Sequence, residues 1–188
     1  SVAEIDALID DAFGFDNFAW QRDNHVSINE PFRADGLHRI LYKCPHCNQE
    51  NEMEGKGTTL TCHACQKSWE MDEFGQLKAL DGETEYSHIP DWYSWQRECV
   101  KKELEEEKYL LDCDVDIVLQ VNLDGVVKIG EGHLRHDLDG FHLTGADGKL
   151  DYKQSPIFSH TLYADYYWYE IDDVIGIGDN EISYFCFP

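Results

Sequence analysis

Four cysteines form the pattern in this sequence that points most directly to chemistry. They occur as two C-x-x-C pairs, Cys44 with Cys47 and Cys62 with Cys65, separated by fourteen residues. Thiolates at this spacing are typical of a structural zinc site of the ribbon kind, in which four sulfurs surround one tetrahedral ion. Because four thiolates fill that coordination shell, we expect the zinc ion to stabilise the fold and to leave no open position for catalysis.

Two disulfides or four unrelated thiols are the alternatives to a metal site. His46 and His63 stand inside the two pairs, and we expect them to be exposed side chains and not ligands, because the sulfurs already complete the shell. The other cysteines are odd in number and scattered, and no apolar run of signal-peptide length opens the chain. This pattern predicts a cytoplasmic location.

The residues between the pairs must leave the metal and return as a hairpin. The segments 52–54 and 58–61 suit its arms, with a turn at 55–57 that contains Gly55 and Gly57. A further strand pair around the turn at residues 72–75 closes the module near Leu80. We therefore assign residues 42–80 to a zinc ribbon.

Two helices are predicted on either side of the ribbon. Apolar residues recur at helical spacing over 2–13 and Gly14 ends the pattern, within a helical lead-in that we assign to residues 1–41. A second helix begins at Pro90–Asp91 and runs to about Lys108, within a connector over residues 81–112. Its expected buried side consists of Trp92, Trp95, Cys99 and Val100.

From Val115 onward the sequence changes to short apolar runs separated by aspartate and glycine. The runs are 115–121, 126–129, 141–143, 163–171, 174–177 and 182–187. This texture predicts an antiparallel β-sandwich or barrel over residues 113–188. The expected fold class is α+β: an N-terminal helix and zinc ribbon, a connecting helix, and a mainly antiparallel β domain.

Charge limits the partners that this chain can bind. Fifteen basic residues against thirty-eight acidic ones give a net charge of −23. Such a surface repels duplex DNA and anionic lipid, so we expect no nucleic-acid partner. No stretch approaches the roughly 18 apolar residues that cross a bilayer, so we expect no transmembrane segment.

Histidines and aspartates gather at residues 133–147, which raises the question of a second metal site. A hairpin with its turn at Asp139–Gly140 places His133 and His136 on opposite faces, so they cannot chelate one ion together. One face, the predicted core, holds Leu134, His136, Leu138, Phe141 and Leu143; the other, predicted to be solvated, holds Arg135, Asp137, His142 and Thr144.

A calcium loop is also excluded. Asp112, Asp114 and Asp116 have the spacing of its first three ligands, but Ile117 occupies the required glycine position and Leu123 the closing carboxylate position.

A dense aromatic block is the remaining candidate site. It consists of Tyr163, Tyr166, Tyr167, Trp168 and Tyr169. Strand alternation exposes part of it, so Tyr167, Trp168 and Tyr169 are candidate ligand-binding residues for a sugar, a lipid head group or a partner protein. The alternative is a structural aromatic layer over the sheet.

Several stretches together resemble a known family. They are residues 30–38 (EPFRADGLH), the four ribbon cysteines, 88–93 (HIPDWY), 136–141 (HDLDGF) and 164–171 (ADYYWYEI). The set is similar to the region that follows the catalytic domain in Gram-positive bacterial lysophospholipid acyltransferases, the 1-acylglycerol-3-phosphate acyltransferase family. The resemblance covers nearly the whole chain.

The resemblance implies an acyltransferase domain in cis, upstream of Ser1, and a location at the inner face of the membrane through that parent protein. It implies a non-catalytic accessory region that regulates the enzyme or binds a protein partner; a carbohydrate- or lipid-head-group-binding module is the alternative function. The family's catalytic pattern is a histidine followed after four residues by aspartate. His142 and Asp147 match it, without the family's later blocks, so we assign no catalytic residue. Asn48 and Gln66 also depart from the common ribbon pattern, in which glycine follows the second cysteine of each pair.

Overall fold

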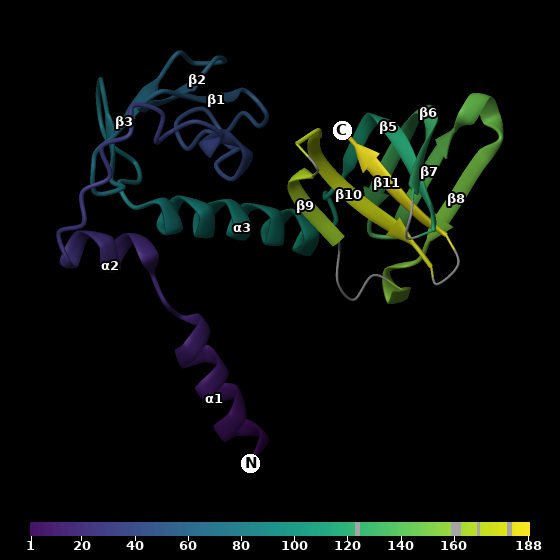
Figure 1. Ribbon diagram of the computed structural model, residues 1–188, viewed down its shortest axis with the longest axis horizontal. Coiled ribbons are helices and arrows are strands. Elements are labelled where there is room, and N and C mark those ends of the chain that lie inside the picture. The colour runs from purple at the N-terminus through teal and green to yellow at the C-terminus, as the bar shows by residue number, and fades with distance from the viewer. Residues whose placement is uncertain (123–124, 159–162, 169, 180–181) are drawn as a thin grey trace. The chain divides into compact units, whose positions relative to one another are not determined.

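The structure is a computed structural model that describes residues 1–188 except 123–124, 159–162, 169 and 180–181, and for residues 121–122 only the backbone. The chain divides into two compact units, Ser1–Cys99 and Val100–Pro188. Among the described residues, the first holds a four-stranded antiparallel sheet and the second a seven-stranded one (Figure 1). The predicted α+β class is confirmed.

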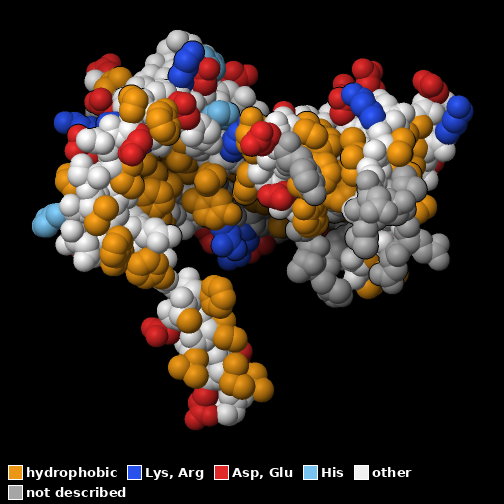
Figure 2. All heavy atoms as spheres, in the orientation of Figure 1, with side chains coloured by type: hydrophobic (Ala, Val, Ile, Leu, Met, Phe, Trp, Pro, Cys, Tyr) orange, Lys and Arg blue, Asp and Glu red, His pale blue; other side chains and the backbone are white. Residues whose placement is uncertain are grey.

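Helix α1 (Val2–Phe13) has the predicted bounds. The Ser1 side chain caps its first turn, with Glu4 completing a capping box, and Gly14 follows its last residue. None of its side chains is buried. Its apolar stripe is visible on the molecular surface (Figure 2) and consists of Val2, Ile5, Leu8, Ile9 and Phe13.

A second short helix and a 3-10 turn lead into the ribbon. Helix α2 (Asn17–Asp23) is capped by Asp16, whose carboxylate accepts from the Ala19 amide at 2.9 Å. The buried Gln21 side chain donates to the carbonyls of Val26 and Glu73, both at 3.0 Å. The 3-10 helix η1 covers Leu37–Arg39. These contacts fix the lead-in against the turn that follows the ribbon's third strand.

The ribbon sheet has strand order β1-β2-β3-β4. Its strands are β1 (Met53–Lys56), β2 (Thr59–Cys62), β3 (Ser68–Met71) and β4 (Leu77–Ala79). The predicted first turn is displaced: Lys56 pairs with Thr59, so the turn is at Gly57, whose φ is +65°. Gly55 lies inside β1, where a Cβ would overlap the Ala34 carbonyl oxygen. Its glycine serves close packing and not the turn.

Helix α3 (Ile89–Glu105) begins one residue before the predicted start at Pro90 and ends three residues before the predicted Lys108. Trp92 is fully buried and packs on Trp69, with ring centroids 5.0 Å apart. Its indole nitrogen donates to the Lys43 carbonyl at 2.9 Å. The core of the first unit therefore forms between this helix and the ribbon sheet.

The described strands of the second unit form one antiparallel sheet, in the order β8-β7-β6-β5-β11-β10-β9. They are β5 (Leu111–Asn122), β6 (Gly125–Asp137), β7 (Gly140–Gly145), β8 (Leu150–Gln154), β9 (Tyr163–Trp168), β10 (Asp172–Gly178) and β11 (Ser183–Phe187), with 3-10 turns η2 (Ala146–Gly148) and η3 (Pro156–Phe158). Strand β8 was not among the predicted runs.

This sheet curls in the manner of an open barrel and does not split into the two layers of a sandwich. Tyr152 of β8 packs on Tyr184 of β11, although three strands lie between β8 and β11 in the sheet order, and the ring centroids are 5.2 Å apart. The Gly178 amide at the end of β10 donates to the Gln154 side chain of β8 at 2.9 Å. A register shift beside Gly130, whose φ is +132°, adds local twist to β6.

Two glycines line the inside of the sheet beneath a buried side chain. Gly132 and Gly145 are directly paired across β6 and β7. The Ile117 side chain covers both, and a Cβ added at Gly145 would lie 2.7 Å from its Cδ1 atom. Ile117 is fully buried and belongs to the main core of this unit.

The β6–β7 hairpin corrects the predicted register. Asp137 pairs with Gly140, so the turn is at Leu138–Asp139 and not at Asp139–Gly140. The predicted pairing is shifted by two residues along β7. A shift of two residues leaves each side chain on the same face of the sheet, so the predicted faces are right for the paired strand residues. The prediction that Leu138 belongs to the core is wrong, because this residue lies in the turn and is 45% exposed.

Candidate metal centre

The two C-x-x-C pairs adopt the same backbone conformation. In the first, the Cys44 amide donates to the Gln49 carbonyl and the Asn48 amide to the Cys44 carbonyl, both at 2.9 Å. In the second, the Cys62 amide donates to the Lys67 carbonyl at 2.9 Å and the Gln66 amide donates to the Cys62 carbonyl at 2.8 Å. The first pair follows Lys43, and the second begins at the last residue of β2. Each turn therefore directs two sulfurs to one point.

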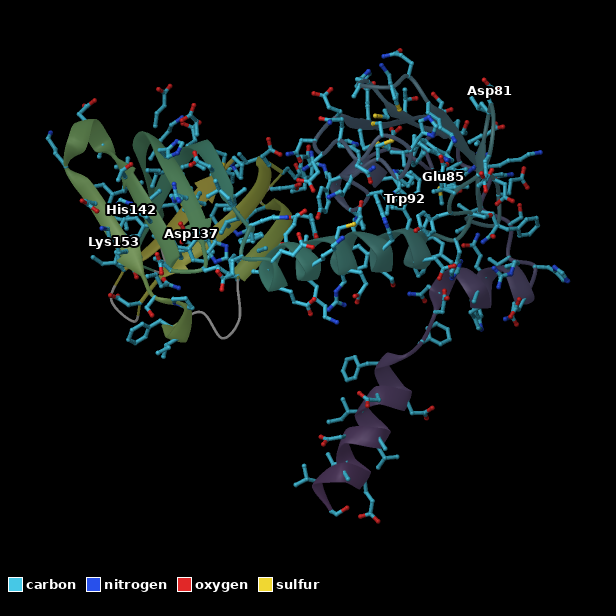
Figure 3. The ribbon with its side chains drawn as sticks, turned by 180° about the vertical axis from the view of Figure 1, so that it is seen from behind. Asp81, Glu85, Trp92, Asp137, His142 and Lys153 are labelled. Carbon is cyan, nitrogen blue, oxygen red and sulfur yellow. The ribbon has the colours of Figure 1, made fainter. Side chains whose placement is uncertain are left out.

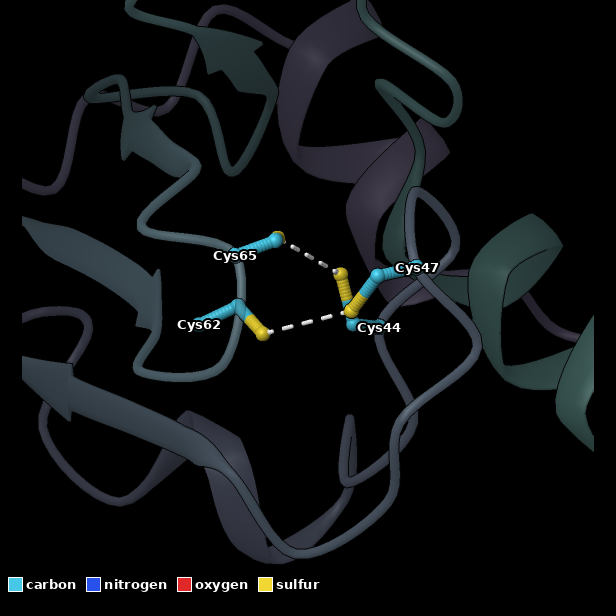
Figure 4. Close-up of side chains that lie close together, drawn as sticks. All are labelled: Cys44, Cys47, Cys62 and Cys65. Carbon is cyan, nitrogen blue, oxygen red and sulfur yellow. Dashed lines mark hydrogen bonds between the residues drawn. The ribbon is translucent and has the colours of Figure 1, made fainter.

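The four sulfurs have the spacing of a tetrahedral thiolate site (Figure 4). The Cys44 and Cys65 sulfurs are 3.8 Å apart, those of Cys47 and Cys62 are 3.7 Å apart, and all four lie within 4.8 Å of one another. An ion about 2.3 Å from each of four sulfurs requires sulfur–sulfur distances of about 3.8 Å, whereas a disulfide bond is about 2.05 Å long. The residues present therefore fit one tetrahedral metal ion.

The residue after each second cysteine has a left-handed backbone. The φ angles of Asn48 and Gln66 are +61° and +64°, the region that glycine adopts at least cost. The departure from glycine at these positions therefore leaves the turn geometry intact. The Gln66 side chain donates to the His63 carbonyl at 2.6 Å.

Backbone amides surround the sulfurs and influence their ionisation. Burial raises the pKa of Cys44 and Cys62, although amides of each turn donate to their sulfurs. Burial alone would also raise the pKa of Cys47, but the Gln49 amide and neighbouring thiols hold it below its usual value. Binding a cation to this set therefore releases protons, since metals bind thiolates.

A partly buried ion pair stands beside the centre. The Lys67 ammonium contacts the Glu85 carboxylate at 2.6 Å, and their side chains are 9% and 18% exposed. Glu85 also accepts from the Trp69 indole at 3.3 Å. Burial opposes ionisation of Glu85, but the hydrogen bond and charge of Lys67, a backbone hydrogen bond and the hydrogen bond to His46 together hold the pKa of this carboxyl below its usual range. The pair fixes the chain just after the second C-x-x-C turn against the loop that leads to α3.

The two histidines of the metal-binding turns form contacts away from the sulfurs. His46 lies 3.1 Å from Glu85, and His63 lies 3.1 Å from Glu54. Both side chains are more than half exposed. Among the described residues, the side chains close enough together to surround one ion are those of the four cysteines of the two C-x-x-C pairs.

The His/Asp-rich hairpin brings its residues together as ion pairs. His133 contacts Asp112 at 2.6 Å and Asp114 at 3.0 Å on the outer face. Hydrogen bonds that the carboxylates of Asp114 and Asp112 accept from the imidazole raise the pKa of His133. His136 points to the inner face, where it stacks on Phe141 with ring centroids 3.7 Å apart. The two histidines therefore lie on opposite faces, as predicted.

His142 is on the outer face of β7, in one cross-strand row with Arg135 of β6 and Lys153 of β8. Figure 3 shows His142 and Lys153 close together on these strands, with Asp137 nearby. The His142 imidazole pairs with Asp151 at 2.9 Å. Asp147, which follows His142 at the spacing of the acyltransferase pattern, lies in the turn η2.

The aromatic candidates have different environments. Tyr167 is 53% exposed and has a left-handed φ of +55°. Trp168 is half-buried and stacks on Phe185, with ring centroids 4.8 Å apart. Tyr169 lies outside the described residues. Tyr163 and Tyr166 of β9 belong to the same aromatic block but were not among the predicted ligand-binding residues; they are 47% and 57% exposed.

Sequence reasoning missed Gln96, which connects α3 to the segment before the first cysteine. Its side chain is 1% exposed, accepts from the Lys43 amide at 3.0 Å and donates to the Ile40 carbonyl at 2.9 Å. The available signal was a polar residue one helical turn after the buried Trp92. The Lys67–Glu85 pair was missed as well, and no local spacing indicates it.

No protein-family model, curated protein or solved structure matches this chain at a significant level. Among the helices in the described ranges, none combines the length and apolarity needed to cross a bilayer.

Proposed function

We propose that this chain is a non-catalytic binding module whose N-terminal unit is held together by a structural zinc ion. The observation that carries the proposal is the set of four sulfurs at tetrahedral spacing on two matching turns. Four thiolates leave no coordination position for water or substrate. When bound, zinc would cross-link the two turns, whose separation in sequence makes this link a large part of the unit's stability.

Metal analysis tests this proposal directly. Purified protein is expected to contain one zinc per chain, and Cys62→Ser is expected to lose the metal and the near-ultraviolet circular dichroism of the first unit. Cys99→Ser is the matched control, because Cys99 is outside the metal centre, and it should retain both. A red, iron-loaded protein would contradict zinc, and a metal-free protein with unchanged spectra would contradict the metal site altogether.

We further propose that the module serves a phospholipid acyltransferase in cis as a regulatory or partner-binding region. Support comes from the sequence resemblance alone. An assay of this chain with lysophosphatidic acid and an acyl donor is expected to show no transfer. Turnover that His142→Ala abolishes would overturn the non-catalytic assignment.

The second candidate function is binding of a carbohydrate or a lipid head group. The exposed rings of Tyr163, Tyr166 and Tyr167 favour it, because they present apolar faces and hydroxyls to solvent. Binding to glycan and lipid arrays is expected to fall on substitution of Tyr166 by alanine. Trp168→Ala is a poorer probe, since this ring also packs on Phe185. No binding on any array would exclude this candidate.

A further inference from the structure

The outer face of the seven-stranded sheet is hollowed by a groove of 1320 Å³. Its apolar floor comes from three strands and the segment before β10, and consists of Val118, Val126, Ile171 and Phe187. Val126 and Ile171 are 52% and 61% exposed. An apolar floor within a defined groove is typical of a site for another chain.

The rim of this groove is strongly acidic. Its carboxylates are Asp114, Asp116, Glu131, Asp147 and Asp172, against which stand only Lys128 and His133 among the described lining residues. Both basic side chains are already paired within the groove, Lys128 with Asp116 at 2.8 Å and His133 with Asp114 at 3.0 Å.

Two rim carboxylates have no ionic partner in the described part of the chain. Glu131 stands on β6, and Asp147 lies in η2, where its φ of +54° directs the backbone into a left-handed turn. Both are exposed. The groove therefore combines an apolar floor with negative charge that the described residues leave uncompensated.

We propose that this groove binds a cationic segment of a partner protein in which apolar residues alternate with lysine or arginine. Apolar side chains of such a segment would cover the floor, while its cations would approach Glu131 and Asp147. Anionic occupants are disfavoured by the rim and by the net charge of −23. The inference deepens the proposed function, on which it depends, by naming the chemistry of the partner.

The test uses the full zinc-loaded chain and four probes. They are a peptide of alternating lysine and valine, the same peptide with serine in place of valine, the same peptide with glutamate in place of lysine, and spermine. We expect only the lysine–valine peptide to bind tightly. Its affinity should fall as salt rises, and its amide shift changes should map to β5, β6 and η2.

Matched double variants separate groove binding from general attraction to an acidic protein. Glu131→Gln with Asp147→Asn is expected to weaken binding of the lysine–valine peptide about threefold to tenfold, since each exposed charge pair contributes modestly. Asparagine also tolerates the left-handed backbone at position 147. Asp139→Asn with Glu105→Gln removes the same charge outside the groove and should change affinity less than about twofold.

Equal weakening of peptide binding in both double variants, or amide shift changes spread over the acidic surface, would overturn the proposal that the peptide binds in the groove. Equal binding of the serine peptide or of spermine would overturn the apolar part of the proposal. Zinc content measured on the same samples distinguishes these failures from a failure of the metal site, because loss of peptide binding with one zinc retained leaves the structural centre intact.

Discussion

Asn48 and Gln66 occupy equivalent left-handed positions that differ in conformational cost. Asparagine tolerates this region, whereas a longer side chain is disfavoured by about 1 kcal/mol. We expect Gln66→Gly to raise the free energy of unfolding by about 0.5 kcal/mol, because relief of the backbone exceeds the loss of the bond to His63. Asn48→Gly should be close to neutral. Urea unfolding of the zinc-loaded protein measures both, and a larger gain at Asn48 would contradict this reasoning.

The titration of His136 is expected to make the free energy of unfolding depend on pH near neutrality. Burial lowers its pKa below the usual value, so the folded state favours the neutral ring. The unfolded chain takes up a proton below about pH 6.5, and the folded one does so only at lower pH. The contribution of His136 to the free energy of unfolding is therefore fully present above about pH 6.5 and is lost as pH falls through the pKa of the folded state. His136→Phe should flatten the acid side of the stability profile.

Unfolding in urea over a pH series measures that slope, and His133 provides a control of opposite sign. Its raised pKa means that its contribution is present below about pH 6.5 and is lost as pH rises through the folded pKa. His133→Gln should therefore act on the other side of the profile. An unchanged acid slope in His136→Phe would show that carboxylates alone govern this range.

At the scale of elements, Gln96 connects α3 to the approach of the metal centre. Gln96→Ala leaves the Lys43 amide and the Ile40 carbonyl without their buried partner. Each such group costs about 1–3 kcal/mol, so we expect a loss of about 2–5 kcal/mol in the free energy of unfolding. Arg97→Ala, on the exposed side of the same helix, should cost less than about 0.5 kcal/mol. Chemical denaturation of both variants checks the difference.

Helix α1 should behave differently from the helix that carries Gln96. Since none of its side chains is buried, Ile9→Ala is expected to change the free energy of unfolding by less than about 0.5 kcal/mol. Its amides should exchange with solvent far faster than those of β2 and of β3, the strand that contains the buried Trp69. Slow exchange in α1 would show that its apolar stripe is covered in solution.

Helices and strands could be predicted where neighbouring residues in the sequence determine them, and contacts between residues far apart in the sequence could not. Helical periodicity and a glycine stop predicted α1, and a proline–aspartate start with an apolar side predicted nearly all of α3. Alternation predicted the faces of the β6–β7 hairpin. A shift of two residues in pairing preserves those faces, so alternation alone did not determine the turn. The cysteine spacing indicated the metal centre, but Gln96 bonds to residues more than fifty positions away. Local patterns do not encode such a pair.

For the molecule as a whole, the two units have separate hydrophobic clusters among the described residues. The cysteine centre belongs to the first cluster, which includes Cys44 and Cys62. A zinc chelator is therefore expected to unfold the first unit and to leave the second folded. In amide spectra, signals from β5 to β11 should persist while those of the ribbon collapse to the narrow range of unfolded chains. Simultaneous loss of both would show that they fold as one.

The close contact of Ile117 with Gly145 has an evolutionary consequence. Gly145 has an extended backbone that any residue adopts, so the isoleucine methyl group is the nearest of the atoms that exclude a side chain there. Shortening Ile117 to valine would remove that methyl group and leave only tight backbone neighbours near 3.0 Å. Among descendants of a common ancestor, alanine at 145 should therefore arise together with a smaller residue at 117, as a compensated pair.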